Sequence, residues 1–410
     1  MSSPDAPRYS HYALAILLTV NFLNYIDRQV LYAVFPLLKA DLQLSDTELG
    51  FLGSAFMIFY MVSAPLIAGL GNRFDRIRLA TAGLVIWSLA TMQAGFASGY
   101  RMLLAARTAV GIGEASFGTI SPGLLSDYFP RAQRGRILSY FFLAIPVGSA
   151  VGYLLGGLLG QYWGWQAAFL IVGMPGLLLA LPLSLLREPP YGGDASETQD
   201  QPTLTGADWL SLFTNRSFVT TTLSMAAMTF ALGGLAQWTP TFLYRVQGLD
   251  VATGNTLFGA ITVLAGITGT LAGGWLGDYL QQRSAKGYLW VSGIGLLLGA
   301  PLVAWAVLTP SLTACLMAIF AAEWLLFLNT GPLNTVIVNV TRPALRAMAF
   351  AVNIFFIHAL GDAISPTLLG YFADYGGLRN ALLITPLALL LAAFFAWLCT
   401  RFIERDDVHK

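Results

Sequence analysis

The sequence predicts an all-α membrane protein with twelve transmembrane helices. Its 410 residues are 56% hydrophobic and only 10% charged, whereas a soluble domain carries about 25% charged residues. The mean hydropathy is +0.66. So few charges cannot cover the surface of a soluble protein of this length, which excludes a secreted enzyme, a nucleic-acid-binding protein and a disordered regulator.

Twelve apolar runs are the second observation behind this prediction. A spanning helix needs about 20 mostly apolar residues. The first run continues to Pro36 without an A-x-A cleavage site, so we interpret it as a retained span and not as a signal peptide. In chain order the predicted spans are 12–36, 47–71, 79–98, 101–126, 136–161, 166–186, 217–244, 252–276, 287–308, 311–338, 346–371 and 378–401.

One connection between the predicted spans is much longer than the others. Residues 187–215 are polar, acidic and contain Pro and Gly, which is typical of a linker. We therefore expect an N-terminal six-helix bundle over 1–186, a cytoplasmic linker loop over 187–215 and a C-terminal six-helix bundle over 216–410.

The distribution of Lys and Arg is the third observation, and it predicts the orientation. Cytoplasmic loops of membrane proteins are enriched in positive residues. With a cytoplasmic N-terminus, 16 Lys and Arg residues fall on the cytoplasmic side and 4 on the other side, namely Lys39, Arg101, Arg245 and Arg379. Both termini are then cytoplasmic, and we expect the inner (plasma) membrane of the cell as the location.

A short loop occurs in both halves, at an offset of 206 residues. Gly69–Leu70–Gly71–Asn72 follows the second span, and Gly274–Trp275–Leu276–Gly277–Asp278 follows the eighth. Small residues let helices approach closely, and an acid or amide can cap a neighbouring helix end and pair with arginine. The alternative is plain packing combined with the positive-inside charge. As candidate gating residues we take Asn72, Arg73, Asp75, Arg76, Asp127, Arg134 and Asp278.

These loops resemble the signature loop of the major facilitator superfamily, and the resemblance covers essentially the whole chain. Trp163–Gly164–Trp165–Gln166 before the sixth span belongs to the same pattern, whereas Asn72 departs from it by replacing the usual acid. The resemblance implies two pseudo-symmetric six-helix bundles, alternating access, and a central cavity lined by the first and fourth spans among others.

Within this superfamily, four stretches resemble the Spinster group. The resemblance implies a transporter of lysolipids or sphingosine phosphates, with proton coupling as our own hypothesis. The stretches are Asn24–Tyr25–Ile26–Asp27–Arg28, Arg107–Thr108–Ala109–Val110–Gly111–Ile112–Gly113–Glu114–Ala115, Ser121–Pro122–Gly123–Leu124–Leu125–Ser126–Asp127 and Gly361–Asp362–Ala363–Ile364–Ser365–Pro366.

Four charged residues lie inside the first and fourth spans. Ionisable residues are expensive in lipid and are functional candidates by default. Arg107 and Glu114 are seven residues apart and share one helix face, and Asp27 and Arg28 lie near the middle of the first span. We predict one neutral cluster in which Asp27 and Glu114 exchange protons while Arg28 and Arg107 orient them and contact an anionic headgroup. The alternative is a static ion-pair network.

The C-terminal half carries fewer intramembrane charges. His358 and Asp362 are four residues apart in the eleventh span, which suits either a relay or substrate contact, or a simple hydrogen bond from His358 to Asp362. Glu323 lies in the tenth span, and Asn329 follows it. All four are candidate substrate contacts. The position that matches Asp27 at the offset of 206 is Gly233, so we expect the proton chemistry to be concentrated in the N-terminal half.

Three prolines are predicted to interrupt spans and to act as bending points: Pro240 in the seventh, Pro332 in the tenth and Pro366 in the eleventh. The sequence contains no phosphate-binding loop, and we expect no cofactor, no metal ion and no disulfide between Cys315 and Cys399.

The sequence thus predicts a monomeric, non-enzymatic, proton-coupled secondary transporter of an amphipathic lipid, either a lysophospholipid or a sphingoid phosphate. Protons and the bilayer are the other expected partners, and nucleic acid is not. One alternative is a facilitator for a small organic anion or drug. A second alternative is a receptor or scaffold with a transporter fold and no flux.

Overall fold

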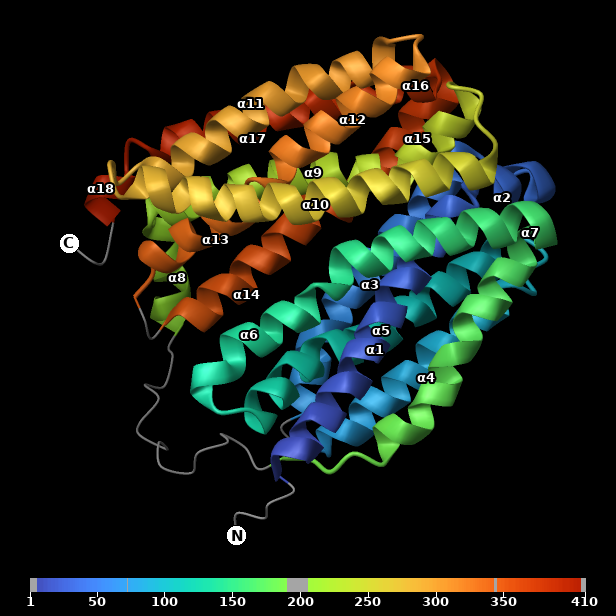
Figure 1. Ribbon diagram of the computed structural model, residues 1–410, viewed down its shortest axis with the longest axis horizontal. Coiled ribbons are helices and arrows are strands. Elements are labelled where there is room, and N and C mark those ends of the chain that lie inside the picture. Colours follow the sequence, from blue (N-terminus) through green and yellow to red (C-terminus); the bar gives the residue numbers. More distant parts are fainter. Residues whose placement is uncertain (1–5, 72, 190–205, 343–344, 407–410) are drawn as a thin grey trace. The chain divides into compact units, whose positions relative to one another are not determined.

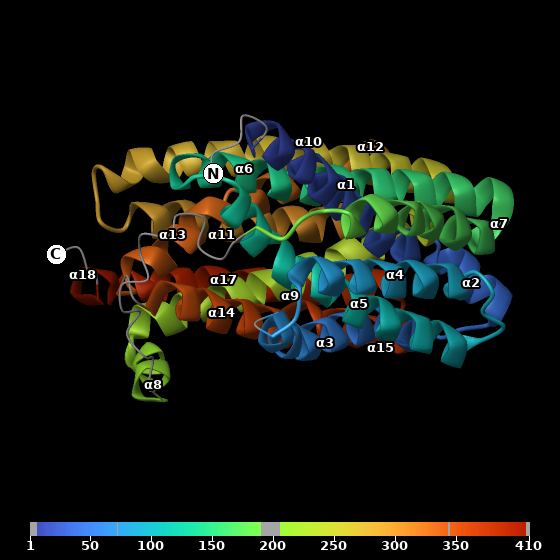
Figure 2. The same cartoon turned by 90° about the horizontal axis from the view of Figure 1, so that it is seen from below.

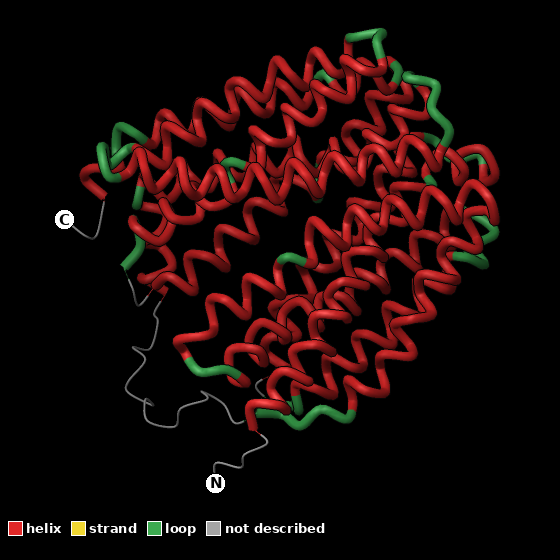
Figure 3. The backbone as a smooth tube through the Cα atoms, viewed as in Figure 1, coloured by secondary structure: helices red, strands yellow, loops and turns green. Residues whose placement is uncertain are grey.

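The computed structural model describes residues 6–71, 73–189, 206–342 and 345–406. Over these ranges the chain consists of helices joined by short loops and turns, without a strand (Figure 3). Two compact units are present. Unit 1 comprises residues 1–199 and 249–259, and unit 2 comprises residues 200–248 and 260–410. Each unit is described by itself.

Unit 1 is built from long helices that pack side by side. Helix α1 packs along α7, and α5 packs against both α3 and α4 (Figures 1 and 2). The first turns of α10 also belong to this unit, where Asn255 Nδ2 donates to the Ala33 carbonyl at 3.1 Å. The helices are α1 (Ala6–Ala33), α2 (Phe35–Leu42), α3 (Asp46–Gly71), α4 (Arg76–Ala94), α5 (Tyr100–Tyr128), α6 (Arg131–Phe142) and α7 (Ala144–Ser184).

Unit 2 contains more interrupted helices. Helix α17 packs against α9 and α11, and α11 packs against α12 (Figure 1). Its elements are α8 (Gly206–Thr214), α9 (Arg216–Arg245), most of α10 (Val251–Gln281), α11 (Gly287–Leu308), α12 (Leu312–Phe327), α13 (Thr330–Asn339), α14 (Arg346–Ile357), the π-helix η2 (His358–Asp362), α15 (Ser365–Gly376), α16 (Leu378–Leu382), α17 (Ile384–Cys399) and α18 (Ile403–Asp406).

Nine helices within the described ranges are long and apolar enough to cross a membrane. One of them, Gln133–Ser184, covers the predicted fifth and sixth spans. These two spans are separated at Gly164, whose φ of +85° lies in the left-handed region that only glycine adopts readily. The predicted first and fourth spans correspond to α1 and α5, which carry the intramembrane charges.

The three prolines differ in their effect on the helices. The tenth span breaks between α12 and α13, just before Pro332, and the eleventh changes into a π-helix before Pro366. Pro240, by contrast, lies inside α9, which is helical from Arg216 to Arg245. The predicted interruption at Pro240 is therefore wrong. A single missing N–H is tolerated in a spanning helix because its neighbours compensate for the freed carbonyl.

Side chains cap several helices at the ends that lie outside the spans. Asp75 accepts from the Arg78 backbone N–H at 2.8 Å and so caps α4. Asp250 accepts from the Thr253 backbone N–H at 2.9 Å at the start of α10. Hydrogen bonds from the side chain and backbone of Thr253 lower the pKa of the Asp250 carboxyl. Both acids also suit the positive end of the helix dipole.

Glycine allows α3 and α5 to approach closely. A Cβ atom at Gly111 would lie 2.5 Å from the Phe56 carbonyl oxygen, which belongs to the backbone of α3 and cannot move aside alone. The close approach also fixes where the Phe56 ring lies, and that ring is part of the site described below. Gly135 on α6, in contrast, faces open space, since a Cβ atom there would have no neighbour within 4 Å.

We expect Gly111→Ala to destabilise unit 1 by about 1–3 kcal/mol, since overpacking forces the α3 and α5 backbones apart. The measurement is thermal unfolding of the purified protein in detergent. The matched control is Gly135→Ala, which adds the same methyl group in open space and favours the helix. Equal melting temperatures for the two variants would contradict the packing described here.

Candidate functional site

An ion pair between α1 and α5 forms the centre of the site in unit 1. Arg28 Nε donates to Glu114 Oε2 at 2.7 Å. The Glu114 side chain is fully buried and that of Arg28 is 17% exposed. A charge-assisted hydrogen bond of this length is among the stronger polar contacts in a protein. The pair therefore ties the C-terminal part of α1 to the middle of α5.

Three aromatic rings surround the Arg28 guanidinium. Its Cζ atom lies 4.9 Å from the Tyr25 ring centroid, 5.0 Å from that of Phe56 and 5.1 Å from that of Tyr60. Each distance is within the range of a cation–π interaction, which strengthens when the cation is desolvated. Tyr25 comes from α1, and the other two rings come from α3. The aromatic rings therefore contact the guanidinium while its Nε–H group donates to Glu114.

Arg107 lies in the same region, but its guanidinium has fewer described polar partners than that of Arg28. It is 1% exposed, and its Cζ atom lies 4.9 Å from the centroid of the Phe56 ring, which it shares with Arg28. Its Nε and Nη2 atoms are buried and have no hydrogen-bond partner among the described residues. Arg107 acts electrostatically on both Asp27 and Glu114. It thus presents buried N–H groups that remain available to an anion.

Asp27 is the second acid of the cluster. It is 2% exposed and lies among Glu114, Arg107 and the polar side chains of Trp87 and Thr91 on α4. Its Oδ1 atom has no hydrogen bond within the part of the chain described. Glu114 is thus bound directly by an arginine, whereas Asp27 is not. The structure brings all four predicted cluster residues together in unit 1, with unequal engagement of the two acids.

Two of the candidate gating residues, Arg76 and Asp127, belong to a second network at the end of α5. Arg76 is buried, and its Nη1 atom donates to Asp127 Oδ2 at 2.7 Å. Its Nε atom and backbone N–H both donate to the Glu188 carboxylate, and its Nη2 atom donates to the Pro189 carbonyl at 3.3 Å. A single arginine therefore connects the start of α4, the end of α5 and the chain that follows α7.

The remaining gating candidates make other contacts. Asp75 caps α4, and Arg134 Nε donates to the Phe129 carbonyl at 3.1 Å. Asp278 accepts from the Tyr288 hydroxyl at 2.7 Å. Arg73 is exposed. Asn72 lies outside the described residues.

In unit 2 the four predicted residues lie in three separate places. His358 Nδ1 and Asp362 Oδ1 are 2.9 Å apart across the π-helix η2. Glu323 on α12 accepts from Thr262 Oγ1 at 3.3 Å. Asn329 is buried, and its Nδ2 atom donates to the Leu325 and Leu326 carbonyls at 3.1 Å each, where α12 ends.

The offset position Gly233 has a clear structural role. A Cβ atom there would collide with Asp362 of η2, which packs against α9 at this point. The first span of unit 1 thus carries its own acid, Asp27, while the corresponding helix of unit 2 carries a glycine beside an acid from the eleventh span. Each half therefore has an acid at this helix position. In unit 1 the helix itself supplies it, and in unit 2 a neighbouring helix supplies it.

A sequence-family model of the Major Facilitator Superfamily matches residues 17–366 of the chain. Protein spinster homolog 3 of Danio rerio is 33% identical, over 97% of this chain and 86% of that protein. The chain belongs to the Spinster family of the major facilitator superfamily. Spinster homolog 1 of Homo sapiens is 35% identical over 90% of this chain and 74% of its own length.

The Spinster assignment extends to solved structures. A bacterial homolog of the human lysosomal transporter Spinster, crystallised in an inward-facing and unoccupied conformation, superposes with a TM-score of 0.90 at 27% identity, covering 99% of both chains. The sphingosine-1-phosphate transporter SPNS2 of Xenopus tropicalis is 30% identical over 100% of this chain and 86% of that protein. The predicted major facilitator fold is confirmed, and this Spinster chain is a multi-pass membrane transporter and not an enzyme.

The structure adds residues to the site that the sequence did not single out. Phe56 and Tyr60 are four residues apart and so share a helix face, but they are two of many aromatics inside spans. Glu188 lies in the segment predicted as a linker. It is 112 residues from Arg76 in the sequence, and no sequence pattern predicts that the two side chains pair. The Spinster site therefore combines predicted charges with aromatic and acidic partners that only the fold brings near.

We expect Glu188→Ala to lower the stability of unit 1 by about 1–3 kcal/mol, because a buried arginine loses a doubly hydrogen-bonded carboxylate. Thermal unfolding in detergent measures this change. The control is Glu404→Ala, which removes the 57%-exposed partner of Lys286 and should change stability by about 1 kcal/mol or less. A Glu188→Ala effect as small as that of the control would show that the Arg76 network contributes little.

Proposed function

We propose that this Spinster protein is a proton-coupled secondary transporter of amphipathic lipids, specifically lysophospholipids or sphingosine-phosphate-like molecules. One observation carries the proposal: Asp27, Arg28, Arg107 and Glu114 are gathered inside the spanning helices of unit 1, with Arg28 paired to Glu114 and Arg107 holding buried N–H groups. A relative named as a sphingosine-1-phosphate transporter supports the substrate class.

The coupling step follows from the unequal engagement of the two acids. The hydrogen bond from Arg28 favours the carboxylate form of Glu114, whereas Asp27 has no arginine hydrogen bond among the described residues, so Asp27 takes up the transported proton first. Its protonation makes the formally neutral cluster positive. A positive cluster binds an anionic headgroup more strongly, and a ligand that binds one protonation state better shifts the equilibrium toward that state.

The headgroup contact is assigned to the arginines. A guanidinium offers a planar set of donors that matches a phosphate, and Arg107 has two such donors without a protein partner in the described structure. Glu323, His358, Asp362 and Asn329 remain candidate contacts of unit 2. The same arginine chemistry suits a small organic anion, which is the alternative substrate class.

We further propose that the transporter works as a monomer in the cell inner (plasma) membrane, with both termini in the cytoplasm. The excess of Lys and Arg on one side supports this topology. On this topology the Arg76 network, together with Asn72, Arg73, Asp75, Asp127, Arg134 and Asp278, lies at the cytoplasmic side. These residues are the proposed inner gate of an alternating-access cycle.

Neutralising either acid tests the coupling. The assay uses wild-type protein in liposomes with and without an imposed pH gradient. We expect the gradient to speed the movement of a fluorescent lysophospholipid about fivefold or more, since about fivefold corresponds to the lower end of typical coupling free energies. Asp27→Asn should remove this stimulation, and Glu114→Gln should reduce it by releasing Arg28. Wild-type pH dependence in both variants would refute the coupling. Absence of any flux in wild-type protein would favour a receptor or scaffold.

Replacing Arg107 tests the substrate class. A lysophospholipid should raise the melting temperature of the purified protein, and Arg107→Lys should weaken its apparent affinity about tenfold, or ~1.4 kcal/mol, because lysine lacks the planar donor set. Arg101→Lys, on an exposed position of the same helix, is the matched control. Stabilisation by a small organic anion without a response to the lysolipid would select the alternative substrate.

A further inference from the structure

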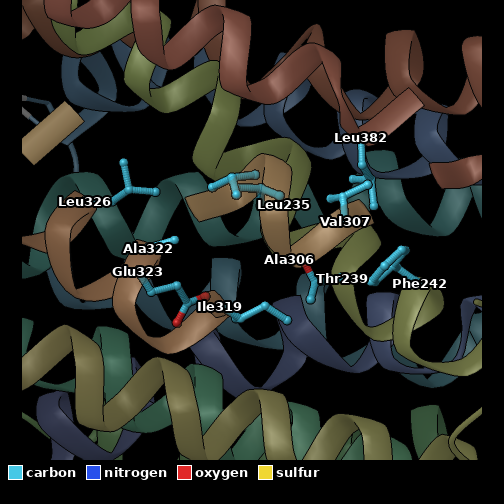
Figure 4. A pocket seen from close by; sticks show the side chains of 11 residues that line it. Leu235, Thr239, Phe242, Ala306, Val307, Ile319, Ala322, Glu323, Leu326 and Leu382 are labelled. Atoms are coloured by element: carbon cyan, nitrogen blue, oxygen red, sulfur yellow. The ribbon is translucent and has the colours of Figure 1, made fainter. Parts of the chain in front are cut away.

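Unit 2 contains a small cavity with one acid in its wall. Side chains of α9, α11, α12 and α16 line it, and its volume of about 30 Å³ admits one or two water molecules. Figure 4 shows Glu323 between Ile319 and Leu326 along α12, with Thr239 and Phe242 of α9 further along the wall. Apart from Glu323 and Thr239, the lining side chains are apolar.

The Glu323 carboxyl has little polar support. Its Oε1 atom accepts one hydrogen bond, from Thr262 Oγ1 of α10 at 3.3 Å. Its Oε2 atom is buried and has no hydrogen-bond partner in the described part of the chain. Thr262 is also the one side chain that acts electrostatically on the group, since the elements packed around the cavity bring no described Lys, Arg, His, Asp or Glu side chain against it.

This environment differs from that of Glu114 in unit 1. Glu114 in unit 1 is balanced by Arg28 at 2.7 Å, so its carboxylate form is stabilised. An uncompensated carboxylate in apolar surroundings costs several kcal/mol, and such a group takes up a proton instead. A neutral carboxylic acid would keep the Thr262 hydrogen bond and could donate its own O–H to water in the cavity.

We propose that Glu323 is a second proton-binding site, located in unit 2 and independent of the Asp27–Glu114 cluster, and that it is protonated in the conformation described here. Its proposed ligand is the proton. Losing that proton leaves a charge that solvent must stabilise. Deprotonation is therefore tied to opening of the cavity, which links the site to conformation.

Infrared difference spectroscopy tests the protonation state directly. We expect wild-type protein at neutral pH to show the carbonyl stretch of a protonated carboxylic acid that is lost in Glu323→Gln. The variant keeps the shape of the side chain and one hydrogen-bond acceptor for Thr262, so it should fold. Thr262→Val removes the hydrogen bond that favours the charged form, and its acid band should persist to higher pH than in wild type.

Labelling with dicyclohexylcarbodiimide, which reacts with protonated carboxyls in apolar surroundings, gives a second readout by peptide mass spectrometry. The adduct on Glu323 should fall as pH rises. A wild-type spectrum without a Glu323-dependent acid band at neutral pH would overturn the proposal, and so would protection from labelling by Na⁺ at constant pH, which would indicate a cation site.

These readouts need no transport, so they separate this proposal from the proposed function, on which only the link to a transport cycle rests. If Asp27→Asn abolishes pH-dependent transport while the Glu323 band remains, both proposals hold. If the band remains in a protein without proton-dependent flux, the coupling fails and the Glu323 site stands.

Discussion

A charged side chain inside a bilayer must find its partners within the protein, because hydrocarbon offers neither counter-charge nor hydrogen bonds. The Arg28–Glu114 pair meets this requirement at 2.7 Å between α1 and α5. The other features of the site in unit 1 follow from it. Aromatic rings cover the rest of the guanidinium, and the rings reach it because Gly111 lets α3 approach α5 at the level of Phe56. Close packing, aromatic coverage and ion pairing are therefore one arrangement.

The two units solve the same electrostatic problem differently. In unit 1 two acids and two arginines share a region, so the formal net charge is zero and a single added proton makes it positive. In unit 2 the acids are dispersed: Asp362 contacts His358, and Glu323 has a threonine and apolar neighbours. A paired acid responds to its arginine, whereas a solitary acid responds to solvent access. This difference supports the proposed roles, in which unit 1 responds to an anionic ligand and Glu323 of unit 2 responds to solvent access.

Most of the predicted spans recur among the nine long apolar helices of the described ranges, because each span reflects a local requirement, about 20 apolar residues in a row. The breaks in the tenth and eleventh spans were also predictable, since Pro332 and Pro366 lack an N–H. The continuous course of α9 through Pro240 was not, because tolerance of a missing hydrogen bond depends on neighbouring helices. Likewise, the charges that cluster near α1 and α5 are visible in the sequence, but the rings over Arg28 are not. Their identification requires the separation between α3 and α1, which no local pattern encodes.

The segment that follows α7 is held by an arginine that also contributes to the predicted membrane orientation. Arg76 is one of the arginines that predict the cytoplasmic side, yet it is buried and bonded to Asp127, Glu188 and Pro189. The backbone at Arg187 is held as well, since its N–H donates to the Tyr9 hydroxyl and its carbonyl accepts from that of Tyr128, both at 2.6 Å. Residues 187–189 are therefore fixed to α1, α4 and α5 and must move with unit 1. An arginine retained only for orientation would be exposed and solvated, so the burial of Arg76 indicates that it also positions the segment connecting the two halves.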